Sequence, residues 1–135
     1  MAASLIGGLI ADGWDPARIR VADNSPGRLQ QLSQQFPIST SIDNCDAADQ
    51  TDIIVLAVKP QVMKSVALEL ASLVARQQPL VISIAAGIHA GALGNWLGKS
   101  TAIVRTMPNT PAMVQSGATA LYANERVSEE QRSIA

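Results

Sequence analysis

Two continuous apolar runs constrain the fold of this chain more than any other feature. Asp52–Val58 and Leu80–Ile84 are apolar almost throughout, as expected for parallel strands that are covered on both faces. A segment typical of a helix follows each run, at Gln61–Ala75 and Ala90–Leu97. Strand and helix candidates that alternate in this way indicate βαβ units in a parallel sheet.

The alternation extends over the rest of the chain. Further strands are expected at Ile19–Asp23, Ile38–Thr40, Thr101–Val104 and Ala118–Tyr122. Further helices are expected at Met1–Ile10, from a Ser25 cap and Pro26 to Gln35, at Cys45–Ala48 and from Ser128 onward. We therefore expect an α/β fold with a mostly parallel sheet, in a single domain.

The composition of the chain limits the classes of molecule that it is expected to bind. The net charge of -1 argues against a nucleic-acid or membrane-surface role, which would require a basic face, so small-molecule partners fit better. No apolar segment is long enough to span a membrane. The single cysteine, Cys45, excludes a disulfide framework and a multi-cysteine metal site, which favours a reducing cytoplasm and no metal. Cys45 itself is expected to pack or to start a helix rather than to act as a nucleophile.

Arg105–Ala112 follows the expected strand Thr101–Val104 and is interpreted as a rigid, polar loop. Pro108 and Pro111 fix their own φ angles and restrict the residues before them to extended conformations. Asn109 would then offer polar groups at the carboxyl end of a strand, which is where open α/β sheets bind ligands.

The turn after the first expected strand carries two conflicting signals. In dinucleotide-binding folds an acidic residue such as Asp23 suits a ribose 2′-hydroxyl, whereas an arginine such as Arg28 suits a 2′-phosphate. Asn24, Ser25 and Arg28 together could hold a phosphate through the guanidinium and a helix N-terminus. This combination favours NADP(H) over NAD(H), although a capped turn with a solvated arginine explains the segment about as well.

Small or charged residues follow the two apolar runs. In Ala57–Gln61, Ala57 would admit a cofactor close to the backbone and Lys59 would face its phosphates or ribose. The alternative for Lys59 is a solvated turn. Ala85–Gly87 has no bulky side chain, so a flat ring could lie against its backbone.

Two further polar residues each allow a functional and a structural interpretation. Asn44 is a plausible cofactor contact, although an Asx turn or a helix cap explains it nearly as well. His89 could serve acid/base chemistry, but at a helix start it fits a surface residue better.

Three motifs give a family resemblance. Leu56–Gln61, Ser83–Ile88 and Arg105–Ala112, in this order and spacing, resemble pyrroline-5-carboxylate reductase, and the match continues through Gly117–Thr119 and Leu121–Asn124. It thus covers essentially the whole chain. That family reduces 1-pyrroline-5-carboxylate to L-proline with NADPH or NADH, the last step of proline biosynthesis. Its Rossmann-type domain, with a doubly wound and mostly parallel sheet, precedes a helical domain that makes the dimer. The resemblance thus implies this α/β fold here and a homo-oligomeric full-length protein.

The resemblance also implies roles for individual residues. Asn24 and Ser25 would lie at the adenosine 2′-phosphate, and Asn44 would contact the adenosine half. The remaining contacts would be Ala57, Val58, Lys59 and Pro60 along the cleft, Ala85, Ala86 and Gly87 at the nicotinamide, and Met107 with Asn109 beside its ring. Hydride would pass to the imine carbon, and no catalytic acid is assigned.

The sequence departs from the family pattern at both ends. Family members begin with a strand and a Gly-x-Gly-Asn-Met turn, and this sequence starts where that methionine would be. We therefore expect an incomplete NADP(H)-binding domain over residues 1–135, in which the strands ending at Asp23 and Val58 lack their shared neighbour. The helical domain would lie beyond Ala135. We expect the fragment alone to be inactive.

Two other functions remain open. One is a different NADP-dependent oxidoreductase, of the F420-dependent or hydroxyacid dehydrogenase type, which would need another loop in place of Met107–Pro111. The other is a non-catalytic nucleotide-binding module.

Overall fold

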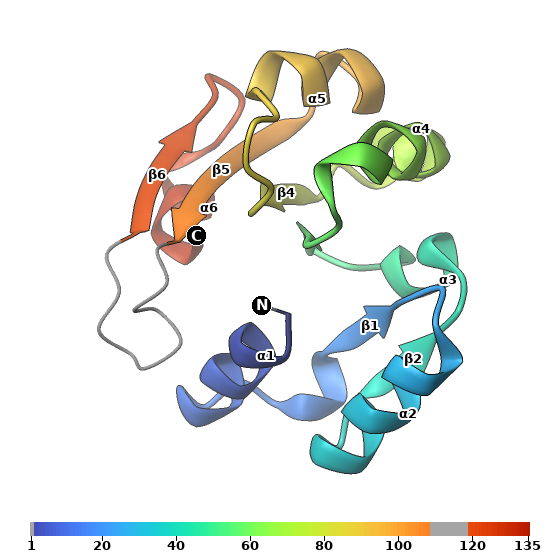
Figure 1. Ribbon diagram of the computed structural model, residues 1–135. Helices are drawn as coiled ribbons and strands as arrows, with labels where there is room; N and C mark the ends of the chain where they lie inside the picture. The colour runs from blue at the N-terminus through green and yellow to red at the C-terminus, as the bar shows by residue number, and fades with distance from the viewer. Residues whose placement is uncertain (1, 109–118) are drawn as a thin grey trace. The chain divides into compact units, whose positions relative to one another are not determined.

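Helices and strands alternate along the computed structural model, which describes residues 2–108 and 119–135 (Figure 1). The chain divides into two units, Met1–Asp49 and Gln50–Ala135, and each has its own sheet. Parallel pairing in both sheets confirms the α/β fold class. None of the helices in the described ranges combines the length and apolarity needed to cross a bilayer.

The first unit is a two-stranded parallel sheet with short helices. Its elements are α1 (Ala2–Ala11), a 3-10 helix (Pro16–Arg18), β1 (Arg20–Ala22), α2 (Pro26–Gln35), β2 (Ser39–Ser41) and α3 (Asn44–Ala48). Arg20 of β1 pairs with Ser39 of β2. Gly7 of α1 lies against Phe36, since a Cβ built there would be 3.5 Å from the phenyl ring. A small residue at this position therefore lets α1 approach the end of α2.

The starts of α2 and α3 correct one detail of the expected capping. Ser25 occupies the N-cap position of α2, and Pro26 is the first helical residue, as predicted, but the Ser25 side chain makes no capping hydrogen bond. Instead the Ser25 N–H donates to Asp23 Oδ1 at 2.8 Å. At α3 the cap is Asp43, whose Oδ1 accepts from the N–H of Asp46 at 2.9 Å. The aspartates, not Ser25 or Asn44, thus organise these two turns.

The second unit is a four-stranded sheet in the order β3-β4-β5-β6. Its elements are β3 (Ile53–Leu56), α4 (Pro60–Gln77), β4 (Leu80–Ser83), α5 (Ala90–Leu97), β5 (Ala102–Pro108), β6 (Thr119–Ala123) and α6 (Glu129–Ile134). The first three strands are parallel, and β6 runs antiparallel to β5. Within the described ranges β1 pairs only with β2 and β3 only with β4.

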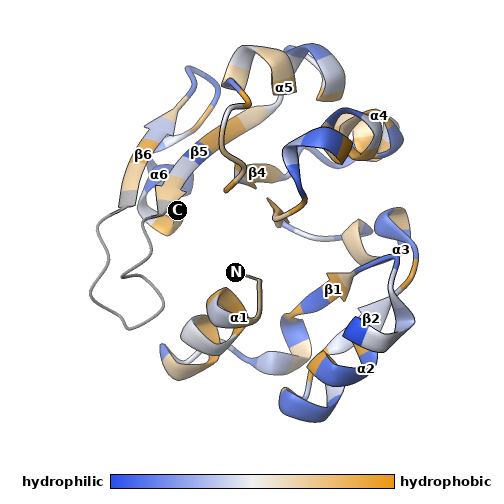
Figure 2. Ribbon diagram, in the orientation of Figure 1, coloured by the Kyte–Doolittle hydropathy of each residue, from blue (hydrophilic) through white to orange (hydrophobic). Residues whose placement is uncertain are grey.

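The core of the second unit lies on the middle strands. Val81 of β4 is fully buried, as its apolar run predicts, and so is Ile103 of β5. In β3, however, Val55 is 37% exposed, so the burial on both faces that was expected of the first apolar run is wrong for this residue. Helix α4 buries Met63 and Val74, and α5 buries Leu93. Figure 2 shows the same pattern, with hydrophobic colour along β5 and alternating colours around α4. These contacts fix the strand ends that follow the core.

Strand β5 is longer than the sequence indicates. The expected strand ended at Val104, with a loop from Arg105, but β5 continues to Pro108, so the loop prediction is wrong for Arg105–Pro108. The reason is β6, which pairs antiparallel with this segment and places Tyr122 opposite Arg105. The extended conformation that Pro108 imposes on Met107 also suits a strand. The rest of the predicted loop, Asn109–Ala112, lies outside the described residues.

Asn124 holds the start of β5 to the end of β6. Its side chain donates to the Thr101 carbonyl at 2.9 Å and accepts from the Ile103 N–H at 3.1 Å. The Asn124 N–H also donates to the Ile103 carbonyl at 3.0 Å. Thr101 and Ile103 are buried, so the Asn124 side chain satisfies backbone groups that water does not reach.

We predict that Asn124→Ala lowers the free energy of unfolding by about 1–3 kcal/mol, because it leaves a buried N–H and a buried carbonyl without partners. Urea unfolding of the purified chain measures the change. Asn95→Ala, at an exposed position in α5, is the control and should change stability by less than about 0.5 kcal/mol. Equal effects of the two substitutions would contradict the role of Asn124.

Candidate functional site

Four candidate residues gather at the carboxyl end of β1. Asp23 follows the strand, and its Oδ2 lies 3.6 Å from Nη1 of Arg28. The Arg28 side chain is 68% exposed, whereas that of Asp23 is 25% exposed. Asn24 is exposed and Ser25 is half-buried. The structure thus brings Asn24, Ser25 and Arg28 together in one turn, as predicted.

The Asp23–Arg28 pair explains the conflict between the two sequence signals. Asp23 already accepts the Ser25 N–H and faces the Arg28 guanidinium, so its charge is partly balanced. An ion pair this exposed contributes less than about 1 kcal/mol to stability. A phosphate could therefore replace Asp23 as the partner of Arg28 at little cost in free energy. Arg28 also lies in the first turn of α2, where the helix dipole favours an anion. The turn therefore suits a phosphate group.

Asn44 lies at a helix start in the same unit. It is the first residue of α3 and is half-buried. Asp43, not Asn44, caps this helix, so helix capping no longer accounts for Asn44.

The second unit places two candidate segments at the ends of neighbouring strands. Ala57–Pro60 follows β3 and Ala85–Gly87 follows β4. A hydrogen bond links the two strand ends, because the Ile84 N–H donates to the Leu56 carbonyl at 3.2 Å. The two segments predicted to meet a cofactor therefore lie at one edge of the sheet.

Small side chains leave the backbone accessible at this edge. Ala57 and Ala86 are exposed, while Ala85 is buried. Gly87 has a φ of 76°, which L side chains rarely adopt, and a Cβ there would meet nothing within 4 Å. The conformation, not crowding, thus requires glycine. A flat group could lie against this turn.

Lys59 and Pro60 form the start of α4. Lys59 is the N-cap residue, its side chain makes no capping hydrogen bond, and it is exposed. Pro60 is the first helical residue, a position where its missing N–H costs nothing. Val58 is half-buried. A cation at a helix start works with the helix dipole to attract an anion.

The last two candidates lie at the end of β5. Met107 is 48% exposed and pairs with Ala120 of β6. Asn109 lies outside the described residues. The candidate residues therefore form two groups, one in the first unit and one in the second.

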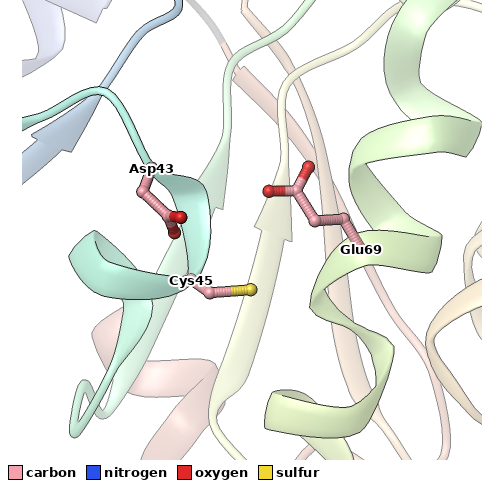
Figure 3. Close-up of side chains that lie close together, drawn as sticks. All are labelled: Asp43, Cys45 and Glu69. Atoms are coloured by element: carbon pink, nitrogen blue, oxygen red, sulfur yellow. The ribbon is translucent and has the colours of Figure 1, made fainter.

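Cys45 belongs to a helix start, as the sequence predicts. Figure 3 shows Asp43 and Cys45 at the beginning of α3 and Glu69 on α4, which belongs to the other unit. Cys45 is half-buried and is not part of a disulfide. The Asp43 carboxylate caps α3, which gives this residue a structural role.

Sequence reasoning missed a pocket in the second unit. His89, Ala90 and Gly91 line it together with Arg105 and Tyr122, and its volume is about 280 Å³. His89 is exposed, as the interpretation of a surface residue predicts, whereas Arg105 lies in β5 and not in a loop. The one available signal was a charged residue, Arg105, directly after an apolar strand.

A comparison with known protein families identifies the family of this chain. The family described as "NADP oxidoreductase coenzyme F420-dependent" matches residues 1–87. The chain belongs to this family of NADP oxidoreductases. The matched range contains the strand ends at Asp23, Val58 and Ala85–Gly87, but it stops before Met107–Pro111.

Individual relatives of this NADP oxidoreductase chain are pyrroline-5-carboxylate reductases, which confirms the resemblance drawn from the three motifs. The Pseudomonas aeruginosa protein is 46% identical over 131 residues, covering 97% of this chain and 48% of the relative. The solved Coxiella burnetii reductase is 42% identical, with a TM-score of 0.95 over 98% of this chain and 49% of its own. A Plasmodium falciparum reductase, described with NADP bound, is 26% identical, with a TM-score of 0.82 over 98% and 47%. The chain thus spans about half the length of these relatives.

We predict that Gly87→Ala lowers the free energy of unfolding by about 1–2 kcal/mol, because alanine is strained at positive φ. Gly94→Ala, in the middle of α5, is the matched control. Its new Cβ would lie 3.9 Å from Ile103, and the substitution should raise stability by about 0.5–1 kcal/mol. Thermal or urea unfolding of both variants measures the difference, and a tolerated Gly87→Ala would contradict the strained turn.

Proposed function

We propose that a protein carrying this chain reduces 1-pyrroline-5-carboxylate to L-proline with NAD(P)H, and that residues 1–135 form part of its NADP(H)-binding Rossmann-type domain. The observation that carries the proposal is the position of the three motifs. Each follows or completes one of the adjacent parallel strands β3, β4 and β5. Parallel strands present their carboxyl ends at one edge, where α/β sheets bind cofactors.

The adenosine end of the cofactor would lie in the first unit. Arg28 and Ser25 offer a cation and a hydroxyl for a 2′-phosphate, with Asn24 exposed beside them. Asn44 would contact the adenosine half. The NADP described in the Plasmodium falciparum structure supports NADP(H), with NAD(H) as the alternative.

The nicotinamide end would lie in the second unit. Ala57, Val58, Lys59 and Pro60 would line the cleft, Ala85, Ala86 and Gly87 would flank the ring, and Met107 with Asn109 would lie beside it. The accessible backbone at Gly87 and the cation at Lys59 fit a flat ring and a pyrophosphate. When bound, the nicotinamide supplies hydride to the imine carbon. These residues bind and orient the reactants, and none of them is assigned as the proton donor.

The remaining parts of the site and the assembly would come from outside this chain. A helical domain would complete the imine pocket and form a homo-oligomer, and the partner of the whole protein would be the small-molecule substrate. A single cysteine, which cannot form a disulfide within the chain, is consistent with a cytoplasmic location.

The test joins this chain to those parts of the Pseudomonas aeruginosa relative that lie outside the matched region. We predict that the joined protein oxidises NADPH when pyrroline-5-carboxylate is added, while the 135-residue chain alone does not. Absorbance at the NADPH band measures the reaction, and the complete Pseudomonas aeruginosa protein is the positive control. If the joined protein folds and reduces a different substrate instead, the proposal fails.

Cofactor choice gives a second test. In the joined protein, Arg28→Ala should raise the KM for NADPH by about tenfold or more, because it removes a charge-assisted contact. The KM for NADH should stay nearly unchanged, since NADH has no 2′-phosphate. Arg126→Ala, at an exposed position after β6, controls for the loss of a positive charge. Equal changes for the two cofactors would rule out a role of Arg28 at the 2′-phosphate.

A further inference from the structure

The pocket beside α5 has features that the proposed cofactor site does not use. Its lining comes from the start of α5, from β5 and from β6, three elements that lie side by side in Figure 1. Ile103 of β5 faces α5 at Gly94. Arg105 lies two residues further along the same strand, so it projects from the same face. Tyr122 pairs directly with Arg105 and shares this face.

Arg105 brings an unsatisfied charge to the pocket. Arg105 as a whole is half-buried, and its side-chain Nε is a buried donor without a hydrogen-bond partner among the described residues. Within the described ranges no carboxylate forms an ion pair with Arg105, and none of the lining residues is acidic. A buried donor on a charged group destabilises the protein when it has no acceptor. The described residues supply no acceptor for this N–H, and none of the lining residues neutralises the charge of Arg105.

The start of α5 adds positive potential to the same pocket. The helix begins at Ala90, has no acidic residue in its first turn, and its N-cap residue His89 makes no side-chain capping bond. Ala90 and Gly91 both line the pocket. Free N–H groups at a helix start, together with the helix dipole, favour an anion.

We propose that this pocket binds a small carboxylate, held by the Arg105 guanidinium and the first turn of α5. A guanidinium edge matches the two oxygens of a planar carboxylate. The exposed Tyr122 offers a hydroxyl for one oxygen and a ring face for a short carbon chain. A volume of about 280 Å³ leaves room for a small carboxylic acid.

The test is an NMR titration of the ¹⁵N-labelled chain with propionate, without any nucleotide and at constant ionic strength set by chloride. The side-chain Nε–H signal of Arg105, identified by its loss in Arg105→Lys, should shift and saturate together with the amides of Ala90 and Gly91. Arg105→Lys keeps the charge but should weaken propionate binding at least about tenfold. Arg126→Lys is the matched control and should leave binding unchanged.

A second variant and a second anion complete the test. Tyr122→Phe, at an exposed position on β6, should weaken binding severalfold without disturbing the fold, and the wild-type titration stands even if Arg105→Lys misfolds. Inorganic phosphate replaces propionate in a parallel titration. Shifts that never saturate, or unchanged binding in a folded Arg105→Lys, would overturn the site. Tighter binding of phosphate than of propionate would overturn its assignment to a carboxylate.

Discussion

Strand β5 pairs along both edges, in parallel with β4 and antiparallel with β6, and the second unit depends on this double pairing. Its successive residues Ile103 and Val104 point to opposite faces and are almost fully buried, so both faces of the strand are covered. Asn124 fixes the start of the strand through buried backbone groups of Thr101 and Ile103. The same register sets the position of Arg105 and Met107, the residues to which the two proposals assign ligands.

The strand ends connect this framework to the proposed chemistry. Two segments, Ala57–Pro60 and Ala85–Gly87, lie at one edge of the sheet. The strands before them, β3 and β4, are parallel, and the hydrogen bond between Leu56 and Ile84 joins their carboxyl ends. Small residues at this edge leave the backbone open, and the positive φ of Gly87 holds the turn in a shape that a larger residue would strain. In the first unit, Asp23 orders the turn that carries Ser25 and Arg28. The proposed cofactor contacts therefore rest on backbone geometry as much as on side-chain chemistry.

Much of the fold could be predicted from local sequence signals. The continuous apolar runs located β3 and β4, and α5 has the bounds that the sequence indicated, Ala90–Leu97. The end of β5 was wrong because its partner β6 comes from beyond residue 118, and no pattern within Thr101–Val104 shows such a pairing. The Ser25 cap was wrong in detail: the Ser25 side chain makes no capping hydrogen bond, and the Asp23 carboxylate accepts the Ser25 N–H instead.

The candidate site was predictable only where residues share one turn or neighbouring strands. Asn24, Ser25 and Arg28 are close in sequence, so their proximity followed from the strand end before α2. The pocket at Arg105 was missed because it depends on the faces of three elements, which pairing and packing decide. The contacts assigned to Asn109 stay a prediction.

The central claim is that an NADP cofactor binds at these strand ends. A crystal structure of the joined protein with NADP⁺ tests it most directly. The account predicts the 2′-phosphate within hydrogen-bond distance of Ser25 and Arg28, and the nicotinamide ring against Ala85–Gly87. A cofactor bound with its 2′-phosphate away from both Ser25 and Arg28, or with its ring away from the β4 turn, would contradict it.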